Sequence, residues 1–109
     1  MRYTREYLAR MAFMMRAPGR LQKILREMID QKMGPMVLKS GRVSTKRRMA
    51  YKATVDIATR IGITPGRVYQ LLNEPYAHPH ERTQLAIARV ALEENPPSLT
   101  PFKRLLDND

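Results

Sequence analysis

Residues 54–73, TVDIATRIGITPGRVYQLLN, constrain the fold more than any other part of the chain. Apolar side chains recur there at steps of three and four residues, which is the spacing of one face of a helix. Gly62 interrupts the pattern and suits a left-handed turn, and Ala58 is small enough to let two backbones approach closely. Thr64 can cap a second helix, and Pro65 fits its first position, where no backbone donor is needed. The stretch therefore predicts two short helices packed across a tight turn.

This pattern resembles the helix-turn-helix of bacterial and phage transcription regulators. Counted from Thr54, the small residue is at the fifth place and the glycine is at the ninth, as in those proteins. The remaining constrained places are all aliphatic here: Ile57, Ile61, Ile63, Val68 and Leu71. The resemblance implies a DNA-binding protein whose second motif helix lies in the major groove.

A wider likeness covers roughly residues 46–97. A helix expected at 80–94 stands where regulators of the lambda repressor and Cro type place the helix that closes the domain. The ending NPPSLTPF is similar to small phage- and plasmid-borne repressors, including the anti-CRISPR-associated type. Those domains have a separate helix before the motif, whereas KRRMAYKATVDIATRIG shows no Gly or Pro break. Either helix 20–33 supplies that first helix, or residues 46–52 form it with an inconspicuous turn.

The remaining residues predict an all-α fold, a helical bundle. Helices are expected at 4–16, 20–33, 46–61, 64–73 and 80–94, with a last turn or two from Thr100. Gly34-Pro35 should end the second helix, and residues 36–44 should form either a short β-hairpin or an exposed basic loop. We expect three parts: an N-terminal helical hairpin at 1–35, a helix-turn-helix DNA-binding domain with a basic segment at 36–97, and a C-terminal tail helix at 98–109.

The charge of the chain is uneven. It has 20 Lys and Arg against 10 Asp and Glu, a net charge of +10. Residues 1–52 hold 14 cations against three acids, whereas residues 53–109 hold six against seven. Positive charge this lopsided is typical of a protein with a polyanionic partner, most often nucleic acid, although a solvated surface is the simpler alternative. There is no cysteine, which excludes disulfides and thiolate metal sites.

The motif helix and the basic run supply two sets of candidate DNA contacts. Outward positions of the second motif helix should read base edges: Gly66, Arg67, Tyr69, Gln70 and Asn73. Arg can grip guanine through two acceptors, and Gln or Asn can pair with adenine. Tyr69 can instead contact a phosphate or a thymine methyl, or pack against the following loop. The phosphate set is Thr64, Lys39, Arg42, Lys46, Arg47, Arg48 and Lys52. For the basic run we favour phosphate tracking over a minor-groove arm.

One reading helix covers only a few base pairs, so we expect a homodimer on an inverted repeat of double-stranded DNA, acting as a repressor. The dimer contacts should come from apolar surface that a small core cannot absorb. Two candidates are the Met-rich helix 4–16 and a stripe in the tail: Leu99, Phe102, Leu105 and Leu106.

Other functions are less well supported. The pair His78 and His80 flanks a proline and has no evident third ligand, so we expect no metal, catalytic residue, cofactor or small-molecule substrate, and no enzyme. A helical protein–protein interaction module and an RNA-binding adaptor remain alternatives. No apolar run approaches a membrane span or a secretory leader, so we expect a protein of the bacterial cytoplasm or nucleoid, without membrane contact.

Overall fold

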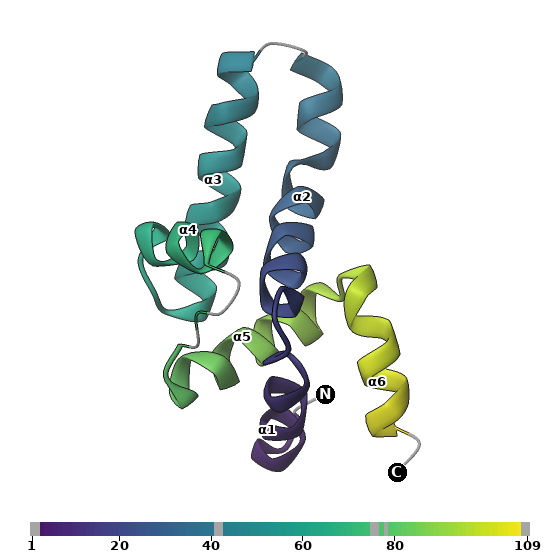
Figure 1. Cartoon of the computed structure of the whole chain (residues 1–109). Helices are drawn as coiled ribbons and strands as arrows, with labels where there is room; N and C mark the ends of the chain where they lie inside the picture. The colour runs from purple at the N-terminus through teal and green to yellow at the C-terminus, as the bar shows by residue number, and fades with distance from the viewer. Residues whose placement is uncertain (1–2, 41–42, 75–76, 78, 108–109) are drawn as a thin grey trace.

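A computed structural model describes residues 3–40, 43–74, 77 and 79–107, with only the backbone described at 34–40 and 43–47. The described residues form helices and no strand (Figure 1). The elements are α1 (Arg5–Met14), α2 (Arg20–Ser40), α3 (Val43–Ile61), α4 (Pro65–Asn73), α5 (Glu81–Glu94), the 3-10 turn η1 (Pro97–Leu99) and α6 (Thr100–Asp107). The predicted all-α class is confirmed.

The core is aliphatic and rich in methionine. Helix α2 lies at its centre, where it contacts α3, α4, α5 and η1, while α1 packs against α5 and α6. The largest fully buried side chains come from every α-helix but the last: Met11, Ile24, Leu25, Met28, Ile57, Leu71, Ile87 and Leu99. One contiguous cluster of buried residues therefore joins segments from both ends of the chain.

Helices α2 and α3 form a long pair that projects beyond the other helices (Figure 1). The predicted end of the second helix at Gly34-Pro35 is wrong, because α2 continues to Ser40. The hairpin or loop at 36–44 is also wrong, since residues 36–40 belong to α2 and residues 43–44 to α3. A proline inside a helix costs about 3 kcal/mol locally, a preference that tertiary packing of the helix as a whole can outweigh, and α2 packs against α3, α4 and α5.

Helix α3 runs without a break from Val43 to Ile61. The alternative in which residues 46–52 form a separate helix is therefore wrong. Helix α2, which precedes α3 in the sequence, packs against both α3 and α4.

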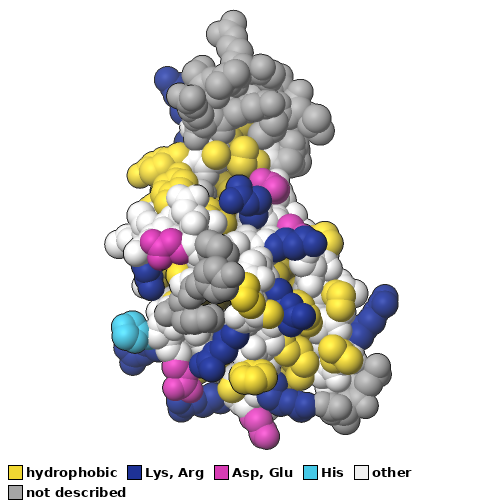
Figure 2. Space-filling model, in the orientation of Figure 1, with side chains coloured by type: hydrophobic (Ala, Val, Ile, Leu, Met, Phe, Trp, Pro, Cys, Tyr) yellow, Lys and Arg dark blue, Asp and Glu magenta, His cyan; other side chains and the backbone are white. Residues whose placement is uncertain are grey.

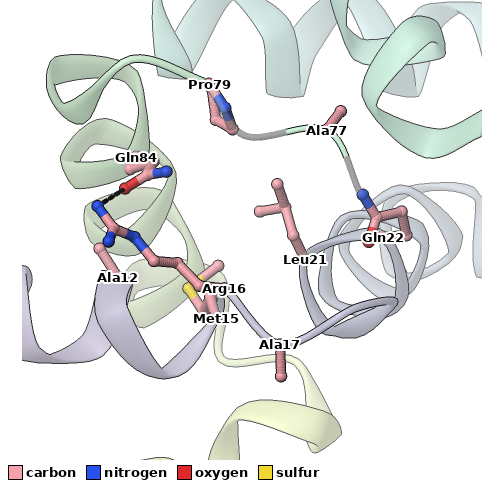
Figure 3. Close-up of a pocket in the computed structure, with 9 residues that line it drawn as sticks. All are labelled: Ala12, Met15, Arg16, Ala17, Leu21, Gln22, Ala77, Pro79 and Gln84. Carbon is pink, nitrogen blue, oxygen red and sulfur yellow. Dashed lines mark hydrogen bonds between the residues drawn. The ribbon is translucent and has the colours of Figure 1, made fainter. Parts of the chain in front are cut away.

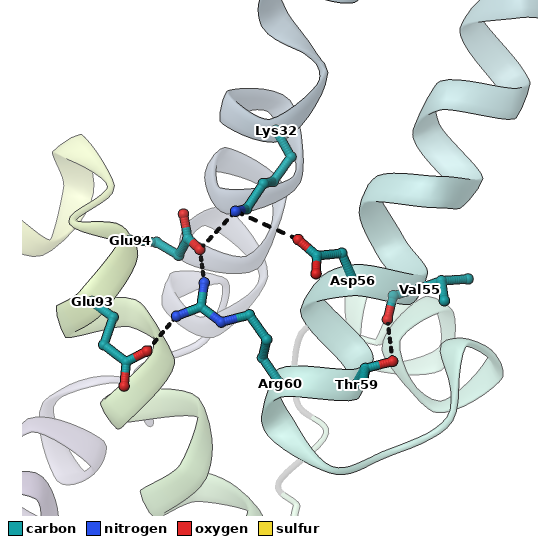
Figure 4. A network of polar contacts seen from close by, with 7 residues as sticks. All are labelled: Lys32, Val55, Asp56, Thr59, Arg60, Glu93 and Glu94. Carbon is teal, nitrogen blue, oxygen red and sulfur yellow. Dashed lines mark hydrogen bonds and ion pairs between the residues drawn. The ribbon is translucent and has the colours of Figure 1, made fainter.

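An ion-pair network fastens α5 to α2 and α3 (Figure 4). Lys32 of α2 lies 3.4 Å from a carboxylate oxygen of Asp56 on α3 and 3.1 Å from one of Glu94 on α5. Arg60 of α3 pairs with both Glu93 and Glu94. The two cations are thus neutralised by carboxylates of the same chain.

Helices α1 and α6 pack on each other near the two ends of the described chain. The Tyr7 hydroxyl donates a hydrogen bond to Asp107 Oδ1 at 3.0 Å. Burial, then this hydrogen bond and the negative charge of Asp107, raise the pKa of Tyr7 from 10.0 to about 12. Among the described residues, no helix has both the length and the apolar character needed to cross a membrane.

Most residues of the apolar stripes suggested as dimer contacts are buried in the core of the single chain. Met11, Met15, Leu99 and Leu106 are buried in the core, where α1, η1 and α6 meet the other helices. Phe13 and Leu105 remain outside, with 70% and 59% of their surfaces exposed.

Candidate nucleic-acid interface

The turn between α3 and α4 is closed by backbone hydrogen bonds. The amides of Gly62 and Ile63 both donate to the carbonyl of Ala58, at 2.8 and 3.0 Å. This is the pattern of a helix end that terminates in a left-handed residue, and Gly62 has φ +94°. A Cβ at Gly62 would meet no atom within 4 Å, so the turn requires glycine for its backbone angle and not for space.

The apolar residues of 54–73 that were predicted to lie in the core do so. The predicted core positions of the two helices are buried: Ile57, Ala58, Ile61, Val68 and Leu71. Ile63, in the turn, is partly buried and packs against the same cluster. The predicted pair of helices across a tight turn is therefore present, although the first has 19 residues and is not short.

The N-terminus of α4 is capped as predicted. Thr64 has an extended backbone, and its Oγ1 accepts a hydrogen bond from the Arg67 amide at 3.1 Å. Pro65 follows at the first helical position. Because Thr64 Oγ1 acts there as an acceptor, its hydroxyl hydrogen can still be donated to another group, such as a phosphate oxygen.

The C-terminus of α4 is held by a residue that the sequence pattern does not predict. Gln22 Nε2, from α2, donates to the carbonyl oxygens of Leu71 at 2.9 Å and Glu74 at 3.0 Å. The Gln22 side chain is buried, and its Oε1 has no hydrogen-bond partner among the described atoms. The one sequence signal for this residue is its spacing, because it lies three residues before Leu25 on the edge of the apolar stripe of α2.

A small cavity lies beside Gln22, between the start of α2, the end of α1 and the start of α5 (Figure 3). Met15 and Leu21 form part of its apolar wall, and Arg16 Nη2 donates to Gln84 Oε1 at 3.4 Å across its rim. Its volume of about 10 Å³ leaves room for about one water molecule. An organic ligand does not fit there.

Four of the five predicted base-reading residues of α4 share its outward side, and the fifth, Arg67, lies on the flank. Gly66, Tyr69, Gln70 and Asn73 are exposed, and 40% of the Tyr69 surface is accessible. Arg67 is half-buried on the flank of the helix, and its Nη1 donates to Gln70 Oε1 at 2.6 Å. Helix α4 carries no acidic residue, so its outward side presents donors and neutral acceptors only.

The structure describes the side chains of only some of the predicted phosphate contacts. Arg48 and Lys52 are exposed and lie one turn apart on α3, with Tyr51 between them at 55% exposure. The backbone of Lys39 is in α2 and that of Lys46 and Arg47 is in α3, but these three side chains lie outside the described part, as does the whole of Arg42.

Lys and Arg side chains are also spread over the rest of the molecule, interleaved with apolar and a few acidic ones, on the face that Figure 2 shows. Positive charge is thus not confined to α3 and α4. On α3 and α4, Arg60 is paired with carboxylates and Arg67 is half-buried. Arg48 and Lys52 are therefore the basic residues of these two helices with exposed side chains, among the side chains that the structure describes.

No protein-family model matches the chain, and neither the curated proteins nor the solved structures contain a significant match.

Proposed function

We propose that this protein binds double-stranded DNA in a sequence-specific way and regulates transcription as a repressor. The observation that carries the proposal is the outward side of α4, where polar side chains with paired donors and acceptors stand exposed on a capped helix without an acidic group. These are the residue types that distinguish base pairs in the major groove.

Gly66 supports the same interpretation. Its backbone is not left-handed, and a Cβ added there would meet only Thr64 Oγ1 at an ordinary 3.9 Å. The fold therefore has room for alanine, which favours a helix by about 1 kcal/mol over glycine. A glycine at an exposed position that does not require one lets another molecule approach the backbone of α4 closely.

Helix α3 extends the proposed contact along the DNA backbone. Arg48 lies ten residues before Ala58, which sits at the turn-side end of α3, so it is about 15 Å further along the helix axis. Arg48 and Lys52 would meet phosphates there, because exposed cations at that distance from the reading helix lie beyond the bases it reaches.

The proposed regulator acts as a homodimer in the bacterial cytoplasm. Two copies related by a two-fold axis would place their α4 helices about 34 Å apart, in successive major grooves on one side of the DNA. Phe13 and Leu105 are the exposed apolar residues of the two helices first suggested as contacts.

The test combines selection of bound sequences from a random DNA pool with salt titrations of binding to the selected and a random duplex. We expect an inverted repeat to be enriched. Arg67→Ala should cost about 1–3 kcal/mol on the selected site and little on random DNA. Arg48→Ala should weaken binding to both duplexes alike and reduce the slope of log affinity against log salt by about one.

Arg104→Ala is the matched control, since it removes one exposed arginine from α6, a helix that packs mainly on α1 and η1. It should change neither affinity appreciably. Failure to enrich any sequence, or equal losses for the variants at positions 48 and 104, would contradict the proposal and favour a protein-interaction module.

A further inference from the structure

Arg67 and Gln70 are the one directly bonded pair among the predicted base-reading residues. They lie one turn apart on α4, and the guanidinium Nη1 of Arg67 donates to Gln70 Oε1 at 2.6 Å. Arg67 starts from the flank of the helix, and this bond brings its guanidinium toward the exposed side, where Gln70 stands. The two side chains therefore present a single polar surface.

This surface suits one base better than the others. Guanine offers two acceptors in the major groove, N7 and O6, whereas adenine offers the acceptor N7 beside the N6 amino donor. A guanidinium has donors only. Adenine opposite Gln70 would bring its amino group against the guanidinium that already occupies Gln70 Oε1, so two positively polarised groups would compete for one oxygen.

We infer that Arg67 and Gln70 recognise one guanine together, with Gln70 acting as a positioning residue that holds the guanidinium. This inference rests on the proposed function and specifies it further. It differs from the expectation that Gln70 pairs with an adenine of its own. The physical gain is that a long side chain with many rotamers is already ordered before DNA arrives, so less conformational freedom is lost on binding.

The experiment measures base preference on a panel of duplexes in which each position of the selected site is changed in turn. The wild-type protein should prefer guanine at one position of each half-site by about 5- to 150-fold. Arg67→Ala should abolish that preference. Gln70→Ala should reduce the preference at the same position, by about 3- to 10-fold, and the double variant should lose no more than Arg67→Ala alone.

Gln70→Glu provides the rescue. A carboxylate still accepts from Arg67, so the guanine preference should return, while affinity for every duplex falls because of repulsion from the phosphates. Asn73→Ala is the matched control on the same side of α4, since no bond joins Asn73 to Arg67. Its effect should fall on a different position and add to that of Arg67→Ala. Thermal unfolding followed by circular dichroism confirms that all variants are folded.

The outcomes separate the two proposals. If Gln70→Ala alters an adenine preference at a neighbouring position, and its effect adds to that of Arg67→Ala, Gln70 reads its own base and the inference is wrong while the proposed function stands. If Gln70→Glu does not restore the guanine preference, Gln70 does not position Arg67. If the random pool yields no enriched sequence, the proposed function itself fails.

Discussion

The inner and outer sides of α4 follow different requirements. On the inner side, Val68 and Leu71 have no exposed surface, and each is necessary to fill the space against α2 and α3. On the outer side, Gly66, Gln70 and Asn73 are exposed, and the core does not require any of them. The difference shows that stability and recognition are assigned to separate sides of one short helix, so mutations should be able to change one without the other.

The two ends of α4 are each held by a side chain that bonds to its backbone. The hydroxyl of Thr64 satisfies an amide at the N-terminus, and Gln22 satisfies a carbonyl at the C-terminus. Four terminal amides and four terminal carbonyls of a helix lack partners within it, so such caps decide how firmly a nine-residue helix is held. The outer side is therefore presented on a helix fastened at both ends.

The largest effect is expected from the inner side. Leu71→Ala should lower the free energy of unfolding by about 2–5 kcal/mol, because it leaves a cavity beneath α4. Chemical denaturation measures this loss. Tyr69→Ala, on the outer side of the same helix, should cost less than about 1 kcal/mol. Similar losses for the two variants would contradict the division between the sides.

The C-terminal cap should give the next effect. Gln22→Leu removes two hydrogen bonds to α4 and also the unpartnered Oε1, so we expect a loss of about 1–2 kcal/mol in unfolding free energy. Gln31→Leu, at an exposed position of α2, is the control and should be close to neutral. If Gln22 only fills space, the leucine variant will be as stable as the wild type.

The two glycines of the motif should respond with opposite signs. Gly66→Ala should raise stability by about 0.4–1 kcal/mol, because the position is helical and has room for a methyl group. The same variant should bind the selected DNA more weakly. Gly62→Ala should lower stability by about 1–2 kcal/mol, since alanine is strained at φ +94°. Denaturation and binding are measured on the same preparations. A Gly66 variant with unchanged affinity would show that nothing approaches the helix there.

Tyr7 offers a reference far from α4, with the smallest expected effect on DNA binding. Because the pKa of its phenol rises from 10.0 to about 12 on folding, its contribution to stability is complete below pH 10 and is lost between pH 10 and 12. The ultraviolet titration curve of the Tyr7→Phe variant is subtracted from that of the wild type. The difference should show one phenol ionising near pH 12. The variant should bind DNA as the wild type does; weaker binding would mean that α1 and α6 influence α4.

The sequence predicts well where constraints are local. Ala58, Gly62 and Thr64 each satisfy a requirement set by residues within one or two turns, so their roles could be inferred from spacing, and so could the outward side of α4. The bond between Arg67 and Gln70 was not predicted, because spacing allows it without demanding it. Gln22 could not be assigned to the end of α4, since its nearer partner is 49 residues away.

The main error has a similar origin. Gly34 and Pro35 are strong local signals for a helix end, yet α2 passes through both. Local preference is a few kcal/mol at most, and a neighbouring helix can outweigh it. The sequence contains no short-range sign that α2 and α3 would pack on each other. Predictions at breaker residues are therefore least dependable where two long helices pair.

The contact between α1 and α6 also bears on how the chain is made. Tyr7 and Asp107 are 100 residues apart, so α1 cannot meet α6 until almost the whole of this stretch has left the ribosome. At about 5–20 residues per second, that interval is roughly 5–20 s. The buried side chains Met11 and Met15 lie in a region that packs against α5 and α6, so their apolar surface stays open to other molecules during this interval.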